Sequence, residues 1–111
     1  MTSFDEITAG LRAWAAGDRL NTAAVELLIT HETWLRRRDF LDACIDPSED
    51  MARIGWDDAR RFEPDSPAST TERAVLRLAI AIGSDDYRLA AMGRANSEAI
   101  VQAFTTALTR R

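Results

Sequence analysis

The sequence predicts an all-α protein, a single compact domain over residues 1–111 in which about six helices form an irregular bundle with a proline-containing packed loop in the middle. Three observations lead to this prediction. Apolar residues recur at helical spacing in several segments, two of these segments begin with the Ser-x-x-Glu spacing of a capping box, and glycine follows where the periodicity stops. The hydrophobic (46%) and charged (29%) fractions are typical of a folded, soluble chain.

The first predicted helix covers residues 4–16. Ser3 and Glu6 have the capping-box spacing at its start, and Gly17 supplies a stop at its end. The apolar positions of this helix are Phe4, Ile7, Leu11 and Trp14.

A second apolar stretch with helical spacing covers residues 20–35. The helix is expected to break near residues 36–38, because the periodicity weakens before three consecutive arginines. A short helix is then predicted over residues 39–45, which Pro47 ends.

The middle of the chain, residues 46–68, contains all three prolines with acidic and serine residues between them, which is typical of turns. Apolar residues occur throughout this segment, so it is expected to be a packed loop and not a free linker. We predict one short helix near residues 57–62. Residues 51–56 fit either an extended segment or a helical one.

A central helix is predicted between Ser69 and Gly83. Ser69 and Glu72 repeat the capping-box spacing, and residues 74–82 contain a single polar residue. A buried strand is the alternative for so short an apolar run, but the cap and the length to Gly83 favour a helix. Because this helix is apolar on nearly all sides, it is expected to be buried by its neighbours.

Two helices are predicted after the central one. Ser84 is expected to cap a short helix that runs through Met92 and closes at Gly93, and Asn96 is expected to cap the final helix. The apolar stripe of the final helix comprises Ile100, Val101, Phe104, Ala107 and Leu108.

The charge balance limits the partners that the chain is expected to bind. Fourteen basic residues, all arginine, stand against eighteen acidic ones, and the net charge of −4 disfavours nucleic-acid binding because it repels the phosphate backbone. Arginine without lysine, in an alanine-rich chain, indicates a bacterial source with GC-rich codons. No membrane-spanning run or secretory signal is present, and a lone cysteine fits a reducing compartment, so the cytoplasm is the expected location.

The sequence predicts no catalytic, cofactor-binding or metal-binding residue. Cys44 and His31 are the only residues of their kinds and carry no known local signature, so Cys44 is expected to be a buried apolar side chain. Zinc needs several such ligands, the acidic residues of the middle loop lack the spacing of an EF-hand, and no glycine-rich phosphate loop occurs. These absences favour a non-enzymatic function.

Three adjacent arginines beside a tryptophan are the most specific feature of the chain, and two further arginines follow in the middle loop. A guanidinium can bind a carboxylate through two parallel hydrogen bonds, and an indole adds stacking. The candidate interaction patch comprises Trp34, Arg36, Arg37, Arg38, Arg60 and Arg61. It favours a protein-interaction or regulatory module whose partner is a protein with an acidic surface.

Several alternatives stay open. In one alternative, Asp39, Asp42 and acidic residues of the middle loop neutralise the arginines, and Trp34 lies in the core. A weak nucleic-acid-binding module would use the two helices around Gly93 as a helix-turn-helix, although only Arg94 lies near the second helix. A small-ligand binder or an enzyme with an unrecognised site would need a pocket with convergent polar groups. A homodimer would follow from an apolar stripe left outside the core.

Overall fold

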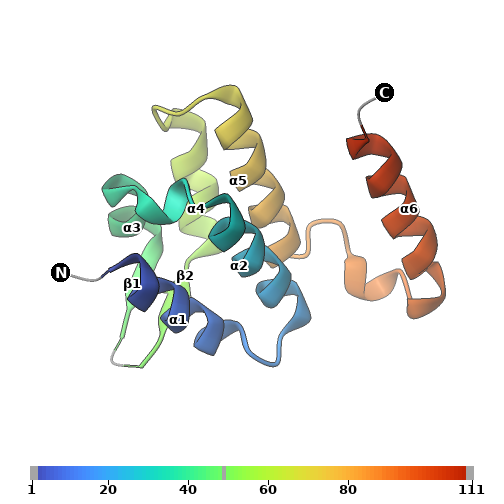
Figure 1. The fold of residues 1–111 in the computed structure, drawn as a ribbon, viewed down its shortest axis with the longest axis horizontal. Coiled ribbons are helices and arrows are strands. Elements are labelled where there is room, and N and C mark those ends of the chain that lie inside the picture. The colour runs from blue at the N-terminus through green and yellow to red at the C-terminus, as the bar shows by residue number, and fades with distance from the viewer. Residues whose placement is uncertain (1–2, 49, 110–111) are drawn as a thin grey trace.

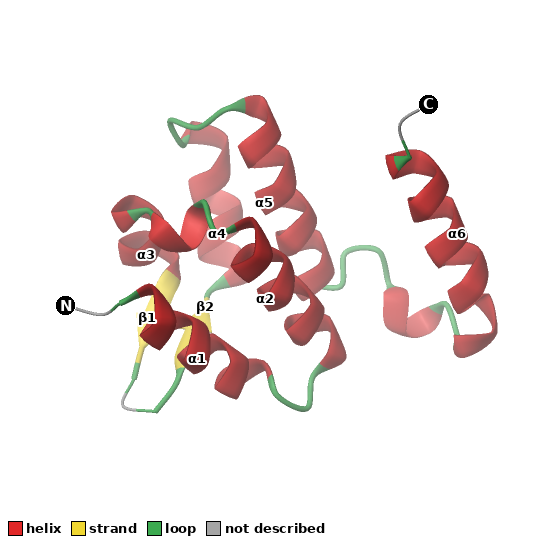
Figure 2. Cartoon of the chain, in the orientation of Figure 1, coloured by secondary structure: helices red, strands yellow, loops and turns green. Residues whose placement is uncertain are grey.

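The computed structural model of the chain describes residues 3–48 and 50–109. It confirms the prediction of an all-α fold, with one short antiparallel hairpin as the additional element (Figure 1). The helices are α1 (Phe4–Ala15), α2 (Arg19–His31), α3 (Arg38–Cys44), α4 (Trp56–Phe62), α5 (Thr70–Gly83) and α6 (Ser97–Leu108). The strands are β1 (Ile45–Pro47) and β2 (Ala52–Ile54) (Figure 2).

The predicted caps hold the starts of α1 and α5. The hydroxyls of Ser3 and Ser69 accept the backbone N–H groups of Glu6 and Glu72 at 3.1 and 3.0 Å. The Glu72 carboxylate also accepts the N–H of Ser69, which completes a capping box. Each cap satisfies a backbone donor that the first turn of a helix leaves free.

The core forms where α2 packs along α5, and α1, α3, α4 and the hairpin close around this pair. Trp34 is completely buried, and its ring lies 5.7 Å from Phe40 and 6.1 Å from Phe62 between centroids. All buried residues of the described chain lie between Ile7 and Ala81. The core is therefore complete before the end of α5.

The second helix is shorter than predicted. It ends at His31, and Glu32 adopts a left-handed conformation with φ of 66° that stops the helix. A 3₁₀ turn, η1 (Trp34–Arg36), follows and places Trp34 and Leu35 in the core. The predicted break near residues 36–38 is present, because Arg37 is extended between η1 and α3, but the predicted continuation of the second helix to residue 35 is wrong.

The middle of the chain contains the β-hairpin. Residues 52–54 are extended, one of the two predicted possibilities, and they pair with residues 45–47 in the register Ile45 to Ile54 and Pro47 to Ala52. The short helix predicted nearby is α4. The sequence analysis did not predict β1, because a three-residue strand carries no periodicity of its own.

Gly10 sets the distance between α1 and the hairpin. A Cβ atom at this position would lie 2.9 Å from the backbone nitrogen of Ala52, which is closer than such atoms approach in proteins. The absence of a side chain therefore lets α1 lie directly on β2. This contact forms one wall of the groove described below.

The helix predicted from Ser84 to Met92 is wrong. Asp85 and Arg88 both have positive φ, 55° and 56°, which a helix cannot accommodate, and only a 3₁₀ turn forms, η3 (Leu89–Ala91). The Asp85 carboxylate accepts the N–H of Leu89 at 2.6 Å and holds this irregular path. Local side-chain bonding thus replaces the helix.

The final helix is present as predicted, but its cap and its surroundings differ. Asn96 does not cap α6, and its side-chain amide donates instead to the carbonyl of Met92 at 2.6 Å. Among the described elements, α6 packs closely only against η4 (Arg94–Asn96), the turn that precedes it. Figure 1 shows α6 standing apart from the other helices.

The contact at Gly10 gives a first prediction. Alanine is the better helix former by about 1 kcal/mol, yet Gly10→Ala is expected to lower the free energy of unfolding by about 1–3 kcal/mol because the new methyl group meets the backbone of β2. Urea denaturation measures this change. Ala13→Gly, at an exposed position of the same helix, serves as the control that measures helix propensity without a contact to β2. A stabilised Gly10→Ala variant would contradict the close contact.

Candidate functional site

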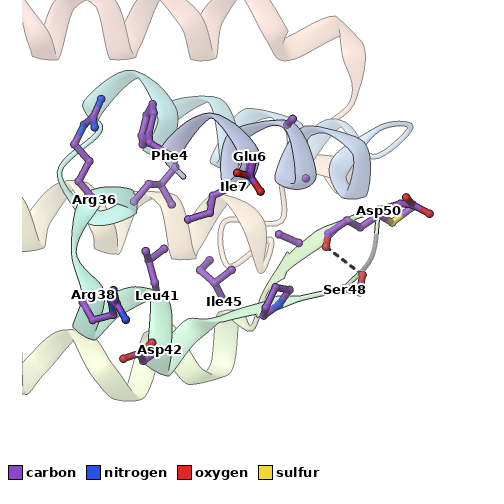
Figure 3. Close-up of a pocket in the computed structure, with 16 residues that line it drawn as sticks. Phe4, Glu6, Ile7, Arg36, Arg38, Leu41, Asp42, Ile45, Ser48 and Asp50 are labelled. Atoms are coloured by element: carbon purple, nitrogen blue, oxygen red, sulfur yellow. Dashed lines mark hydrogen bonds between the residues drawn. The ribbon is translucent and has the colours of Figure 1, made fainter. Parts of the chain in front are cut away.

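An open groove of about 1060 Å³ lies between α1, α3 and the hairpin. We call it the hairpin groove. Its apolar lining includes Phe4, Ile7, Leu41, Ile45 and Met51. Figure 3 shows Leu41 and Ile45 pointing from α3 and β1 toward α1 across the groove. The Met51 side chain is 45% exposed, so part of this apolar surface faces water.

Charged residues are spread along the hairpin groove. Arg36 and Arg38 lie at one end, Asp50 lies at the other, and Glu6 lies between them next to Ile7 (Figure 3). Asp42 lies on α3, one helical turn after Arg38. The groove can therefore receive an apolar segment and orient it by its own charges, with a carboxylate at the arginine end.

The structure separates the adjacent residues of the predicted patch. Trp34 lies in the core, and its indole N–H donates to the carbonyl of Glu72 at 3.0 Å. The Arg36 guanidinium lies 4.0 Å from the centroid of the Phe4 ring and pairs with Glu32 at 2.8 Å, so it covers Phe4 at the end of the groove.

Arg37 points away from the groove. Its guanidinium stacks over Trp34 at 4.9 Å and pairs with Asp39 at 2.6 Å. The hydrogen bond from Arg37 lowers the pKa of Asp39, because it stabilises the ionised carboxylate. Arg37 also donates to the carbonyl of Pro67 at 3.5 Å, so its role in the fold is to hold η1 and α3 against the segment before α5.

Arg38 differs from the other arginines of the patch. It is exposed at the start of α3, and within residues 3–48 and 50–109 it forms no salt bridge. Its guanidinium is thus available to a carboxylate from outside the chain. Together with Arg36, it is the part of the predicted patch that lines the hairpin groove.

Arg60 and Arg61 lie on α4 and do not line the hairpin groove. Arg60 binds both carboxylate oxygens of Asp86, at 3.0 and 3.1 Å, and Arg61 pairs with Asp58 one turn earlier on the same helix. Internal carboxylates therefore occupy both guanidinium groups. The Arg60 pair ties α4 to the segment that follows α5.

Cys44 is buried at the end of α3, as the sequence predicted. Burial, with smaller effects from the negative charges of Asp58 and Asp39, raises the pKa of its thiol to about 12. This environment favours the neutral thiol and disfavours the thiolate that nucleophilic catalysis requires. His31 ends α2, and its buried Nδ1 has no hydrogen-bond partner among the described residues.

The helix-turn-helix alternative lacks its first helix, because the segment before Gly93 forms only the three-residue turn η3. Within the described ranges, no three His, Cys, Asp or Glu side chains come together as ligands for a metal ion. None of the described helices is both long and apolar enough to cross a membrane. No protein-family model, curated protein or solved structure matches this chain.

Two arginines that line the hairpin groove belong to the patch predicted from the sequence, but the apolar lining of the groove was not predicted. Leu41 lies on α3, Ile45 on β1 and Met51 in the turn before β2, and they come together because β2 pairs with β1 and packs on α1. One signal was present in the sequence. Met51 interrupts an acidic, serine-rich turn where an apolar side chain has no local reason to occur.

The thiol environment gives a second prediction. At pH 8, Cys44 is expected to react with a disulfide reagent at least about 100-fold more slowly in the native protein than in 8 M urea, because burial keeps it protonated and inaccessible. Because folding raises its pKa from 9.0 to about 12, the thiol stabilises the fold below about pH 9 and loses this contribution as the pH rises toward 12. The reaction rates of Cys44 in buffer and in urea, followed by spectrophotometry, test the expected protection. Equal rates in both solvents would contradict the burial of Cys44.

Proposed function

We propose that the chain is a non-enzymatic protein-interaction module that binds an acidic, partly apolar segment of a partner protein in the hairpin groove. The observation that carries this proposal is the position of Arg38, an exposed cation without an internal partner among the described residues, at the mouth of an apolar groove. Arg36, Arg37, Arg60 and Arg61 each pair with an internal carboxylate. Within residues 3–48 and 50–109, Arg38 forms no such pair.

The size and lining of the groove support a peptide segment as its ligand. At about 1060 Å³ it lies at the upper end of small-molecule sites, and it is open along its length. Two or three apolar side chains of a bound segment would contact Leu41, Ile45 and Met51. A carboxylate at one end would meet Arg38 on the α3 side, while Arg36 lies beside Phe4 on the opposite side of that end (Figure 3).

The acidic end of the groove gives the bound segment a direction. Asp50 would repel a second carboxylate and favour a basic or neutral residue there. The opposed charges thus select against the reversed orientation. Of the six residues of the predicted patch, Arg38 contacts the partner's carboxylate in this proposal, Arg36 lines the groove beside Phe4, and Trp34 and Arg37 hold the turn that precedes Arg38.

The location that we propose for this function is a bacterial cytoplasm. The arginine-only, alanine-rich composition supports the bacterial source. The single cysteine is buried and unpaired, which fits a reducing compartment.

A peptide library tests the proposed function. Selection of phage-displayed random peptides on the protein is expected to enrich sequences with an acidic residue next to apolar ones. Fluorescence anisotropy of an enriched peptide then measures affinity, and Arg38→Glu is expected to weaken binding by about tenfold or more, because it reverses the charge that meets the peptide carboxylate.

A matched control makes this test specific. Arg19→Glu changes the net charge equally at an exposed position of α2 outside the groove, and it is expected to alter affinity by less than about twofold. If no acidic peptide is enriched, or if both variants weaken binding equally, the groove is not the binding site.

A further inference from the structure

The apolar stripe of α6 is uncovered. Val101, Phe104 and Leu108 share one face of the helix, and their exposed fractions are 63%, 47% and 77%. Among the described elements, α6 packs closely only against the turn that precedes it, so the core does not cover this face. An exposed apolar stripe of this kind marks an interaction surface.

The composition of α6 indicates that it does not persist alone in water. Helices shorter than about 12–15 residues are marginal without tertiary contacts, and α6 has 12 residues. It includes four β-branched residues, which are weaker helix formers, and Glu98 is its only charged residue. Ion pairs between successive turns therefore cannot stabilise it. Its helical state requires a surface that covers its apolar face.

The outer flank of α5 offers such a surface. Val75, Leu78 and Ile82 follow the i, i+3, i+7 spacing of one helix face. Their side chains are partly buried, and they lie outside the group of residues that pack on the core. The sequence predicted a helix buried on nearly all sides, and this stripe keeps some exposure to water. The chain thus carries one exposed apolar stripe, on α6, and one partly exposed stripe, on α5.

The connection between the helices keeps α6 away from the α5 flank of its own chain. Asp86 is fixed twice: its N–H donates to the carbonyl of Ala81 at 2.8 Å, and its carboxylate binds Arg60 through two hydrogen bonds. The left-handed residues Asp85 and Arg88 then direct the chain outward. Figure 1 shows the result, with α6 separated from α5 by the whole connection.

We propose that two copies of this chain form a dimer by exchanging α6, so that the α6 stripe of each copy packs along Val75, Leu78 and Ile82 of the other. The area needed for a stable dimer favours exchange over a simple α6–α6 pair. A helix of 12 residues is about 18 Å long. A pair of α6 helices would cover only the α6 stripe of each copy. Specific interfaces bury about 800 Å² on each partner. Exchange of α6 covers the α5 and α6 stripes of both copies, and its two-fold symmetry limits the assembly to a dimer.

This surface is distinct from the hairpin groove. The groove lies toward the N-terminal side of the molecule, whereas α6 lies at the opposite end of the long axis (Figure 1). Dimerisation would therefore leave both grooves accessible.

Sedimentation equilibrium tests the dimer, with Phe104→Glu as the disrupting variant. The native chain is expected to sediment as a dimer at about 100 μM, and Phe104→Glu is expected to weaken association at least about tenfold by placing a charge in the apolar contact. Gln102→Glu adds the same charge on the opposite face of α6 and is expected to leave association unchanged. A native chain that stays monomeric at this concentration would overturn the proposal.

Cysteine cross-linking identifies the arrangement without relying on a destabilising charge. Chains carrying Leu78→Cys are mixed with chains carrying Phe104→Cys and oxidised, while the buried Cys44 stays protected. Exchange predicts mixed dimers that join position 78 of one chain to position 104 of the other. Dimers joined only between two copies of position 104 would establish α6–α6 pairing, and an internal bond in a chain carrying both cysteines would establish docking within one copy. Either outcome would overturn the exchange.

Discussion

The complete burial of Trp34 determines how the rest of the molecule is arranged. Its ring contacts Phe40 and Phe62, and its N–H reaches the backbone of α5, so one side chain joins η1, α3, α4 and α5. An indole can be buried in this way only if its N–H finds an acceptor. The short 3₁₀ turn that delivers Trp34 to the core also sends its neighbours Arg36 and Arg37 in different directions.

The three adjacent arginines therefore occupy different environments. Arg37 turns inward to Asp39 and Pro67 and braces the fold, whereas Arg36 and Arg38 reach the groove. The repulsion expected among three adjacent guanidinium groups is thereby relieved. Both surfaces proposed to bind proteins depend on how the chain leaves a helix: the groove on the exit from α2, and the exposed α6 on the exit from α5.

The sequence predicted those parts of the fold that local chemistry determines. Capping boxes, helical periodicity and terminal glycines located the long helices, because these signals act within a few residues. The path of residues 84–92 could not be predicted, since it depends on the two hydrogen bonds that Arg60 of α4 donates to Asp86. Likewise, the charged half of the groove was visible in sequence as an arginine run. Its apolar half was not, because the hairpin assembles it from distant residues.

The core of this protein closes at Ala81, before the final helix begins. Substitutions in the stripe of Val101, Phe104 and Leu108 therefore cost the folded core little, and natural selection acts on them through the proposed contact with a second copy. Paired changes on α6 and α5 can alter that association over evolutionary time while the core stays intact. The position of the last buried residue thus separates the part of the sequence that is constrained by folding from the part that is constrained by association.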